Sequence, residues 1–257
     1  MAERPLRIAV FPGDGIGDEI AGPCVALLEA AVRKAGGFAL EFDWLPAGAR
    51  CYAKTGAALP EASMAAARAA DAILLAAMGL PDIRYPDGTE ISPQIELRMA
   101  LGLYAGVRPV RAIPGIAAAL ADPRAHALDF VIIRESTEGL FASHGKGEVI
   151  GDREARDTMV ITRGVSERLF DFAFRLGAKR RRQGHAGRVT CVDKANVFKS
   201  FAFFRKLFDE IAAGHPDVSA DHAYVDATAL NMVRRPWALD VLVTENMFGD
   251  ILSDLGA

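Results

Sequence analysis

Short apolar runs alternate along this chain with longer segments in which apolar residues recur every three or four positions. Runs of the first kind are typical of buried strands, and segments of the second kind are typical of amphipathic helices. Strands that alternate with helices predict an α/β fold with a largely parallel core sheet. The predicted strands lie at residues 6–11, 39–44, 73–78, 107–111, 128–133 and 188–192, with a further strand ending at 223–227. The predicted helices lie at 19–35, 60–71, 93–104, 165–176 and 198–211, with a last one after residue 246.

A glycine-rich turn, Pro12-Gly13-Asp14-Gly15-Ile16-Gly17-Asp18, joins the first predicted strand to the first helix. Strand, glycine loop and helix in this order are the arrangement that cradles phosphate groups in dinucleotide-binding proteins. The spacing of the glycines here differs from the GxGxxG of those proteins. We therefore interpret the segment mainly as a tight strand-to-helix turn.

The composition argues against a nucleic-acid-binding, membrane-bound or disulfide-rich secreted protein. At 257 residues the chain is long enough for two lobes, and its net charge of −3 gives no general attraction to nucleic acid or to an anionic membrane. We interpret the one basic run, at residues 179–182, as the solvated end of a helix. The few, widely spaced cysteines predict a reducing compartment. Because the sequence also shows no signal-peptide pattern and no apolar run of membrane length, we expect a soluble, cytoplasmic protein.

Two aspartates stand out in the last predicted helix. Asp250 and Asp254 are four positions apart and share one helix face. Like charges one turn apart repel each other unless a cation lies between them, and carboxylate oxygens suit Mg²⁺ or Mn²⁺. From the spacing alone, two solvated surface aspartates are an equally good interpretation.

The wider string, Thr244-Glu245-Asn246-Met247-Phe248-Gly249-Asp250-Ile251-Leu252-Ser253-Asp254, resembles the metal-binding signature of the β-decarboxylating dehydrogenases. This family includes isocitrate, 3-isopropylmalate, homoisocitrate and tartrate dehydrogenases. Further stretches resemble other signatures of the same family, and the resemblance extends from about Arg7 to the last residue. These stretches are Gly13-Asp14-Gly15-Ile16-Gly17, the segment from Leu97-Arg98 to Arg108-Pro109, Arg134-Glu135-Ser136-Thr137-Glu138-Gly139, and Lys194-Ala195-Asn196.

The resemblance implies an α/β fold of two lobes that is not a Rossmann fold and that has mixed sheets flanked by helices. The first lobe, on the cofactor side, would comprise residues 1–99 plus 250–257, and the second lobe residues 100–249. Residues 140–163 would form a β-arm that clasps a second subunit, although an ordinary surface hairpin fits their pattern as well. We therefore expect a homodimer with shared active sites.

The family's functional residues can be carried over to matching positions of this chain. Arg98, Arg108 and Arg134 match the arginines that bind the substrate's carboxylates, a role that suits guanidinium groups because they bind carboxylates bidentately. Lys194 matches the catalytic lysine, and in relatives it acts with Asp226 in the partner subunit's site. The implied catalytic residues are thus Lys194 and Asp226, and the implied metal ligands are Asp226, Asp250 and Asp254. The implied substrate-binding residues are Arg98, Arg108, Arg134, Ser92, Gln94, Ile95 and Asn196.

The activity implied is the oxidative decarboxylation of a malate-type 2-hydroxy acid with Mg²⁺ or Mn²⁺ and hydride transfer to NAD, with NADP as the alternative acceptor. Ser92 and Gln94 are polar whereas Ile95 is apolar, at positions that select the hydroxy-dicarboxylate or tricarboxylate substrate. We favour a 3-isopropylmalate-like substrate, with isocitrate and tartrate still open. A non-catalytic, carboxylate-binding regulatory homologue is the alternative of another class.

The chain departs from the family pattern in two places. Phe141 occupies the position where relatives usually have a tyrosine that protonates the enolate carbon. Relatives also continue past the position of Ala257 through a segment that binds adenine and ribose. We therefore expect the cofactor-binding residues to lie mostly beyond Ala257. Since the resemblance continues undiminished to the last residue, we expect the sequence to be part of a longer protein.

Overall fold

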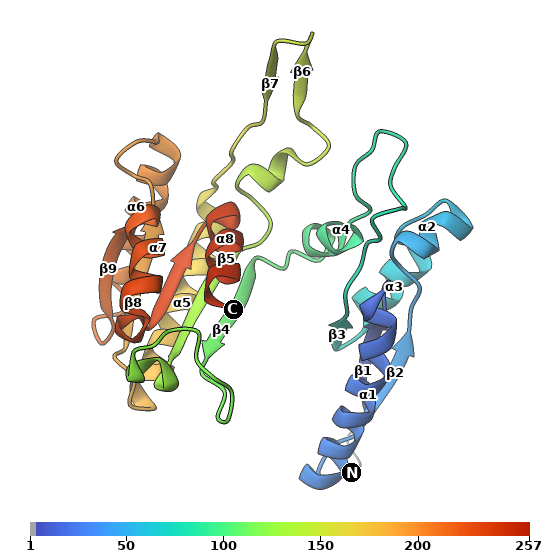
Figure 1. Ribbon diagram of the computed structural model, residues 1–257, viewed down its shortest axis with the longest axis horizontal. Helices are drawn as coiled ribbons and strands as arrows, with labels where there is room; N and C mark the ends of the chain where they lie inside the picture. Colours follow the sequence, from blue (N-terminus) through green and yellow to red (C-terminus); the bar gives the residue numbers. More distant parts are fainter. Residues whose placement is uncertain (1–3) are drawn as a thin grey trace. The chain divides into compact units, whose positions relative to one another are not determined.

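The computed structural model describes residues 4–257 and divides into two compact units, Met1–Leu101 and Gly102–Ala257 (Figure 1). Both units consist of a β-sheet with α-helices, which confirms the predicted α/β class. No helix within residues 4–257 is both long and apolar enough to cross a membrane.

The first unit contains a three-stranded parallel sheet in which β1 lies between β2 and β3. Its core includes Phe11 of β1 and Leu97 of the last helix. That helix ends at Ala100, earlier than predicted, because Gly102 has a positive φ of 60° that does not continue a helix. The elements are β1 (Leu6–Phe11), α1 (Ile16–Ala35), β2 (Leu40–Trp44), α2 (Ala49–Thr55), α3 (Glu61–Ala69), β3 (Ala72–Leu75) and α4 (Pro93–Ala100).

Asp14 organises the glycine-rich turn after β1. Its buried carboxylate accepts hydrogen bonds from the backbone N–H groups of Ala49 (2.6 Å), Arg50 (2.9 Å) and Gly79 (2.9 Å). Ala49 and Arg50 are the first residues of α2, so the carboxylate occupies the place at the helix N-terminus that suits an anion. A Cβ atom added at Gly48 would lie 2.2 Å from Asp14 Oδ2. The segment is therefore a structural turn, as its glycine spacing indicated.

Replacing Asp14 with alanine is expected to destabilise the first unit by about 3 kcal/mol or more, because three backbone donors lose their acceptor and a buried unpaired donor costs about 1–3 kcal/mol. Urea unfolding followed by the fluorescence of Trp44, in a Trp237→Phe background, measures the change. Asp18→Ala is the matched control, since the ion pair of Asp18 with Arg50 is half-exposed and contributes about 1 kcal/mol or less. Equal losses in the two variants would contradict the role given to Asp14.

The second unit is built on a five-stranded sheet with the order β4-β5-β10-β8-β9. β4 is antiparallel to β5, and the other neighbours are parallel, which gives the predicted mixed sheet. Its strands are β4 (Ala105–Arg111), β5 (Asp129–Glu135), β8 (Arg188–Asp193), β9 (Ser219–Tyr224) and β10 (Val241–Thr244). Its helices are α5 (Arg163–Arg182), α6 (Lys199–Ala212), α7 (Val225–Arg234) and α8 (Asn246–Gly256), with short 3-10 turns at Pro123–Ala127, Leu140–Ser143 and Pro236–Ala238.

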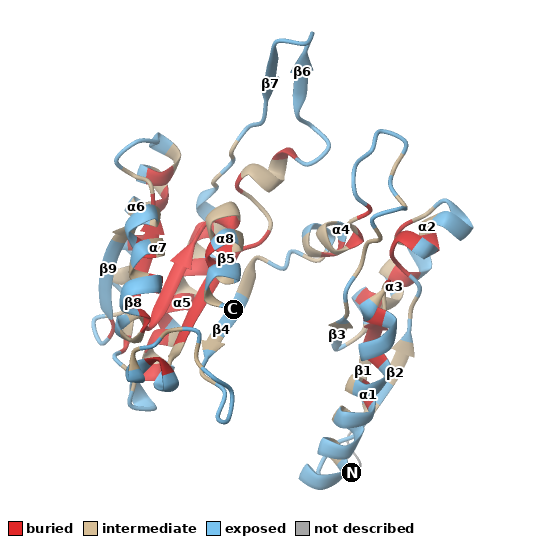
Figure 2. Cartoon of the chain, viewed as in Figure 1, coloured by how far each residue is buried: buried red, intermediate tan, exposed pale blue. Residues whose placement is uncertain are grey.

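Helices cover both faces of this sheet. Successive side chains of a strand point to opposite faces, and the central strands carry apolar side chains on both, so both faces need a covering layer. Val131 and Ile133 of β5 pack in one core with α5 and the phenylalanine-rich α6. Phe130 and Ile132 pack in a second core with residues of α7 and α8. β5 and β10 are accordingly buried between the two layers (Figure 2). This arrangement fixes which side chains of each strand face α8.

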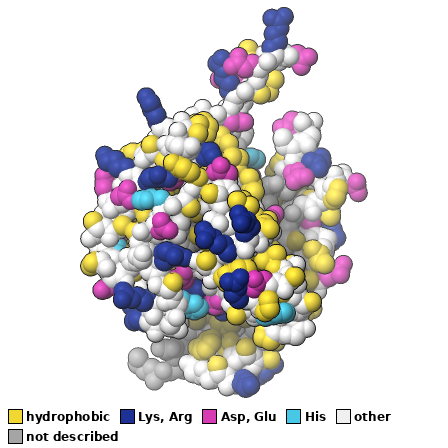
Figure 3. Space-filling model, turned by 60° about the vertical axis from the view of Figure 1, so that its left-hand side comes forward, with side chains coloured by type: hydrophobic (Ala, Val, Ile, Leu, Met, Phe, Trp, Pro, Cys, Tyr) yellow, Lys and Arg dark blue, Asp and Glu magenta, His cyan; other side chains and the backbone are white. Residues whose placement is uncertain are grey.

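Arg180 corrects the interpretation of the basic run 179–182 as entirely solvated. Its side chain is 4% exposed and pairs with Asp129 (2.8 Å) and with the buried Asp240 (2.6 Å). Although burial alone would lower the pKa of Arg180, its hydrogen bonds to these carboxylates raise it. The other residues of the run are not buried. On the face shown in Figure 3, basic side chains lie among acidic and apolar ones.

The structure differs from the predicted lobes and elements in two further respects. Residues 250–257 were assigned to the first lobe, but they belong to α8, which packs on β5 and α7 of the second unit through Leu252.

Val225–Arg234 forms α7, so Asp226 lies in the first turn of a helix, whereas a strand was predicted to extend to residue 227. Apolar Val225 packs against the sheet from this helix, and a short apolar run does not distinguish the two structures.

The segment predicted as a β-arm contains a two-stranded antiparallel hairpin, β6 (Glu148–Ile150) and β7 (Glu154–Arg156). The hairpin extends away from the body of the second unit (Figure 1), and Val149 at its centre is 78% exposed. A two-stranded hairpin with an exposed apolar residue is marginally stable by itself. Its role in clasping a second subunit stays a prediction.

Candidate functional site

Four of the predicted site residues of the second unit lie near the carboxyl ends of its parallel strands. Arg134 is near the end of β5, Lys194 follows β8, and Asp226 follows β9. Asp250 lies on α8, which follows β10. In open α/β sheets this edge is where ligands bind, because the loops and helix N-termini that follow the strands converge there.

Arg134 is buried beneath α8. Its Nε and Nη2 donate hydrogen bonds to Asn246 Oδ1 (3.0 and 2.7 Å), and its Nη1 pairs with the Asp250 carboxylate. A Cβ atom added at Gly249 would lie 2.6 Å from Arg134 Cγ, so only glycine allows the helix to pack this closely. Asn246, which is fully buried, is held in turn by its Nδ2, which donates to the carbonyl oxygen of Glu138 (3.1 Å). Asn246, for which no role was predicted, thus orients Arg134.

Asp250 and Asp254 lie one turn apart on α8, as predicted. Both are within reach of solvent, and the Asp250 side chain is 48% exposed. Carboxylate oxygens on a solvent-accessible helix face are a donor set that fits Mg²⁺ or Mn²⁺. Within residues 4–257, however, no three acidic, histidine or cysteine side chains are grouped closely enough to hold a metal ion.

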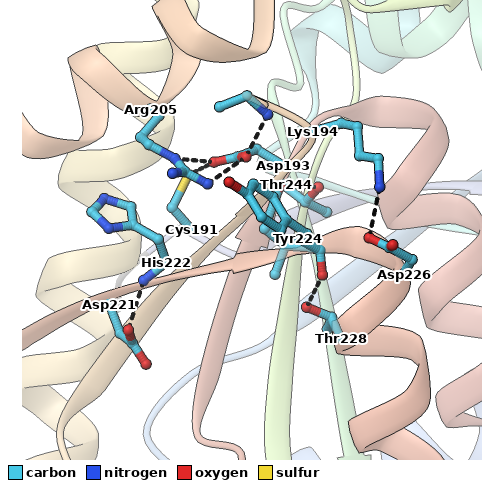
Figure 4. A network of polar contacts seen from close by, with 12 residues as sticks. Cys191, Asp193, Lys194, Arg205, Asp221, His222, Tyr224, Asp226, Thr228 and Thr244 are labelled. Atoms are coloured by element: carbon cyan, nitrogen blue, oxygen red, sulfur yellow. Dashed lines mark hydrogen bonds and ion pairs between the residues drawn. The ribbon is translucent and has the colours of Figure 1, made fainter. Parts of the chain in front are cut away.

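Lys194 and Asp226 form the other ion pair of this edge. Lys194 Nζ lies 2.9 Å from Asp226 Oδ1 (Figure 4), and this hydrogen bond lowers the pKa of the Asp226 carboxyl. The Asp226 side chain is 68% exposed and that of Lys194 is 24% exposed. The pair is therefore accessible to a ligand or to a second subunit.

A buried ion pair holds the turn that carries Lys194. Asp193 is fully buried, and Arg205 of α6 binds it with two hydrogen bonds of 2.8 Å (Figure 4). Asp193 also accepts a hydrogen bond from the backbone N–H of Ala195 (2.8 Å), which fixes the chain on the far side of Lys194. The Arg205 guanidinium lies 5.2 Å from the ring centre of Tyr224, and Lys194 Nζ lies 5.7 Å from the same centre. Arg205 is thus a positioning residue for Lys194.

Arg108 and Asn196, the remaining predicted substrate-binding residues of the second unit, are both exposed to solvent. Arg108 is exposed on the edge strand β4, where it pairs in register with Ile132, and so it projects to the same face of the sheet as Arg134. Asn196 is exposed in the turn after β8. The ring centre of Phe141 lies 5.1 Å from the Arg134 guanidinium carbon. Phe141 is therefore beside a predicted substrate-binding arginine.

The predicted substrate residues of the first unit are gathered on α4. Ser92 precedes the helix, and Gln94, Ile95 and Arg98 lie on it, all of them half-buried. Gln94 Oε1 is the only buried side-chain oxygen or nitrogen in residues 4–257 that has no hydrogen-bond partner. A buried amide oxygen in this state is ready to accept a hydrogen bond from a ligand.

Two buried glutamates at the same edge were not singled out from the sequence. Glu135 accepts hydrogen bonds from the backbone of Thr137 and Glu138, and Glu245 accepts them from Met247 and Phe248 at the start of α8. Burial raises the pKa of both carboxyl groups. Both residues belong to the family-like motifs, but only the structure shows that they hold the turn after β5 and the start of α8.

The sequence matches the family model described as isocitrate/isopropylmalate dehydrogenase over residues 7–257. The chain is 39% identical over 249 residues to the 3-isopropylmalate/3-methylmalate dehydrogenase of Methanocaldococcus jannaschii, covering 96% of this chain and 69% of that protein. It is 40% identical over 258 residues to the 3-isopropylmalate dehydrogenase of Gloeobacter violaceus, covering 98% of this chain and 70% of that protein.

Solved structures of similar fold agree with this assignment. The isocitrate dehydrogenase of Methylococcus capsulatus superposes with a TM-score of 0.84 at 36% identity, covering 98% of this chain and 70% of that one. A β-decarboxylating dehydrogenase of Thermococcus kodakarensis superposes with a TM-score of 0.73 at 35% identity, covering 98% and 67%. The motifs, the fold and these matches lead to one conclusion: the chain belongs to the isocitrate/isopropylmalate dehydrogenase family.

Proposed function

We propose that the protein is a metal-dependent dehydrogenase that oxidises and decarboxylates a malate-type 2-hydroxy acid, with NAD as hydride acceptor and 3-isopropylmalate or a close analogue as substrate. The observation that carries the proposal is the pairing of acidic and basic side chains at one edge of the second unit's sheet. Arg134 pairs there with Asp250, and Lys194 pairs with Asp226. NADP is the alternative acceptor.

Each of these side chains has a defined task in such a reaction. Arg134 and Arg108, on one face of the sheet, bind the substrate's carboxylates and orient its hydroxyl-bearing carbon. Lys194 of the second copy, which comes with its Asp226, accepts the hydroxyl proton, directly or through water, as the oxidation begins. Asp250, Asp254 and the second copy's Asp226 would hold Mg²⁺ or Mn²⁺, which when bound acidifies the hydroxyl group and stabilises negative charge on its oxygen.

A homodimer is part of the proposal, and the surface of the second unit supports it. α7 and α8 pack against each other, and Leu230, Val233, Ile251 and Leu255 on them are 46–61% exposed. An apolar surface on adjacent helices is typical of a protein interface. Asp226 lies on α7, so a dimer formed through these helices would bring it towards the Asp250 and Asp254 of a second copy.

Gln94 favours a second candidate substrate. Its unpaired buried amide oxygen suits a ligand group that donates a hydrogen bond, which an isopropyl group does not offer. Tartrate, whose second hydroxyl group can donate a hydrogen bond, is therefore the alternative substrate that Gln94 Oε1 favours, and isocitrate, whose third carboxylate accepts hydrogen bonds, stays a further alternative. Ile95, the next residue on α4, provides apolar surface for the isopropyl group of the favoured substrate.

The test is the absorbance of reduced cofactor in the presence of Mn²⁺ with isopropylmalate, isocitrate, tartrate and malate, each with NAD and with NADP. Both the 257-residue chain and the product of the complete gene should be assayed. Metal-dependent turnover of one hydroxy acid is the expected result and identifies the substrate. If neither protein turns over any of them while malate still binds, the protein is a non-catalytic, carboxylate-binding regulator.

Phe141→Tyr is expected to raise the yield of decarboxylated product relative to the oxidised keto acid. Phenylalanine has no proton to donate, whereas a phenol beside Arg134 can donate one to the enolate carbon. Product analysis by chromatography after full cofactor reduction measures the ratio. Phe141→Leu, which removes the ring without adding a hydroxyl group, is the control and should give no increase. An unchanged product ratio in Phe141→Tyr would contradict the hypothesis that Phe141 limits the protonation of the enolate carbon.

A further inference from the structure

Both ion pairs at the sheet edge join a proposed metal ligand to a proposed substrate or proton-transfer group. Asp250 pairs with Arg134, and Asp226 pairs with Lys194. Each carboxylate thus has an internal cation as its counter-ion in this structure. The same arrangement occurs on two separate helices, since Asp250 lies on α8 and Asp226 on α7. Pairing of a proposed metal ligand with a basic side chain is therefore a feature of the whole site.

Arg134 has less freedom to move than Lys194, because its side chain is only 3% exposed whereas that of Lys194 is 24% exposed. Two of its N–H groups are engaged by Asn246, which is fully buried and cannot move without breaking its bond to Glu138. Nη1 is engaged by Asp250, whose side chain is 48% exposed. Of these partners, only Asp250 lies where a ligand from solvent can take its place.

We propose that Asp250 acts as the internal counter-ion of Arg134 and competes with a substrate carboxylate for it until a divalent cation binds Asp250. The inference rests on the proposed function. A second carboxylate placed at Arg134 would lie next to that of Asp250, and like charges at such a distance repel each other in a partly buried site. A cation on Asp250 removes this competition. Cation and substrate are therefore coupled through the protein itself, in addition to any direct contact between them.

The same helix offers a matched pair of variants. Asp250→Asn and Asp254→Asn each remove one negative charge from the same face of α8, and each removes one proposed metal ligand. Among residues 4–257, Arg134 forms its ion pair with Asp250, and no ion pair is seen for Asp254. Only the first variant therefore removes the internal competitor.

The experiment is titration calorimetry with malate in EDTA, so that no metal takes part. Asp250→Asn is expected to bind malate about fivefold more tightly than the unmodified protein, which corresponds to about 1 kcal/mol, the upper end for a half-exposed ion pair. Asp254→Asn is expected to stay within about twofold of it. Asp250→Ala should behave as Asp250→Asn does, and thermal unfolding verifies that each variant is folded.

The alternatives give different results. Equal tightening in both asparagine variants would mean that overall charge, not the pair with Arg134, sets the affinity, and would overturn the proposal. An unchanged affinity for malate in both asparagine variants would also overturn the proposal. If the unmodified protein still oxidises a hydroxy acid with Mn²⁺, either result leaves the proposed function intact. If the unmodified protein neither binds malate with Mn²⁺ nor turns over any substrate, the proposed function fails, and this inference fails with it.

Discussion

Lys194→Met is expected to lower kcat by a factor of about 10²–10⁴, the contribution of a positioned acid–base group, with little change in thermal stability. The loss of kcat follows because methionine has no group to accept the hydroxyl proton. Stability should hold because Asp226, the partner of Lys194, is 68% exposed, and ion pairs open to solvent contribute little to folding. Initial rates of cofactor reduction with Mn²⁺ and the identified substrate, together with the melting temperature, measure both effects.

Two further substitutions sharpen this prediction. Lys199→Met removes an exposed lysine at the start of α6 and should leave kcat unchanged. Lys194→Arg keeps the positive charge but should not restore activity, because a guanidinium group stays protonated at all relevant pH values. A kcat for Lys194→Met within a few-fold of the unmodified protein would remove Lys194 from the proposed mechanism.

Arg180→Ala is expected to destabilise the second unit by about 3–5 kcal/mol, because it leaves the buried Asp240 carboxylate without its cation. Arg180 also binds the side chain and the carbonyl oxygen of Asp129, so the ends of α5, β5 and β10 lose a common link. Urea unfolding followed by circular dichroism measures the loss. Arg182→Ala, an exposed residue of the same basic run, is the control and should change stability by about 0.5 kcal/mol or less. Similar losses in the two variants would contradict the structural role of Arg180.

The pH dependence of the Arg180 variant gives a second, independent test. Burial alone would raise the pKa of Asp129, but its hydrogen bond to Arg180 lowers it. A carboxyl whose pKa is lower in the folded state stabilises the protein above its unfolded-state pKa of about 3.9, and this contribution is lost as the pH falls through the folded value. The unmodified protein should therefore lose more stability than Arg180→Ala does between pH 5 and pH 3.

The strands and helices of this protein follow from local patterns, and most of them were predicted. The apolar runs at 6–11, 128–133 and 188–192 are strands, and the phenylalanine-rich helix at 198–211 is α6 with a shift of one residue. Such patterns depend on the period of apolar residues within a short window, so they are visible in the sequence. The Asp250–Asp254 spacing on one helix face is visible for the same reason.

The candidate site was predicted as a set of residues but not as a set of contacts. Arg134 and Asp250 are 116 positions apart, and Lys194 and Asp226 are 32 apart, so no local pattern records that they form ion pairs. The same separation concealed the role of Asn246. It is one of several polar residues in a quoted motif, and only its contact with Arg134 distinguishes it.

Local periodicity and contiguous motifs are enough to predict the α/β class, the order of most elements and the residues that the family resemblance identifies. Which charges are buried, and with what partner, depends on the tertiary structure. Arg180 has the same sequence context as its solvated neighbours, yet its position on α5 directs it to Asp240 and Asp129. The helix that carries Asp250 likewise belongs to the second unit because β5, more than 100 residues earlier, provides its packing surface. Burial and pairing depend on contacts between distant segments, which exist only once the chain has folded.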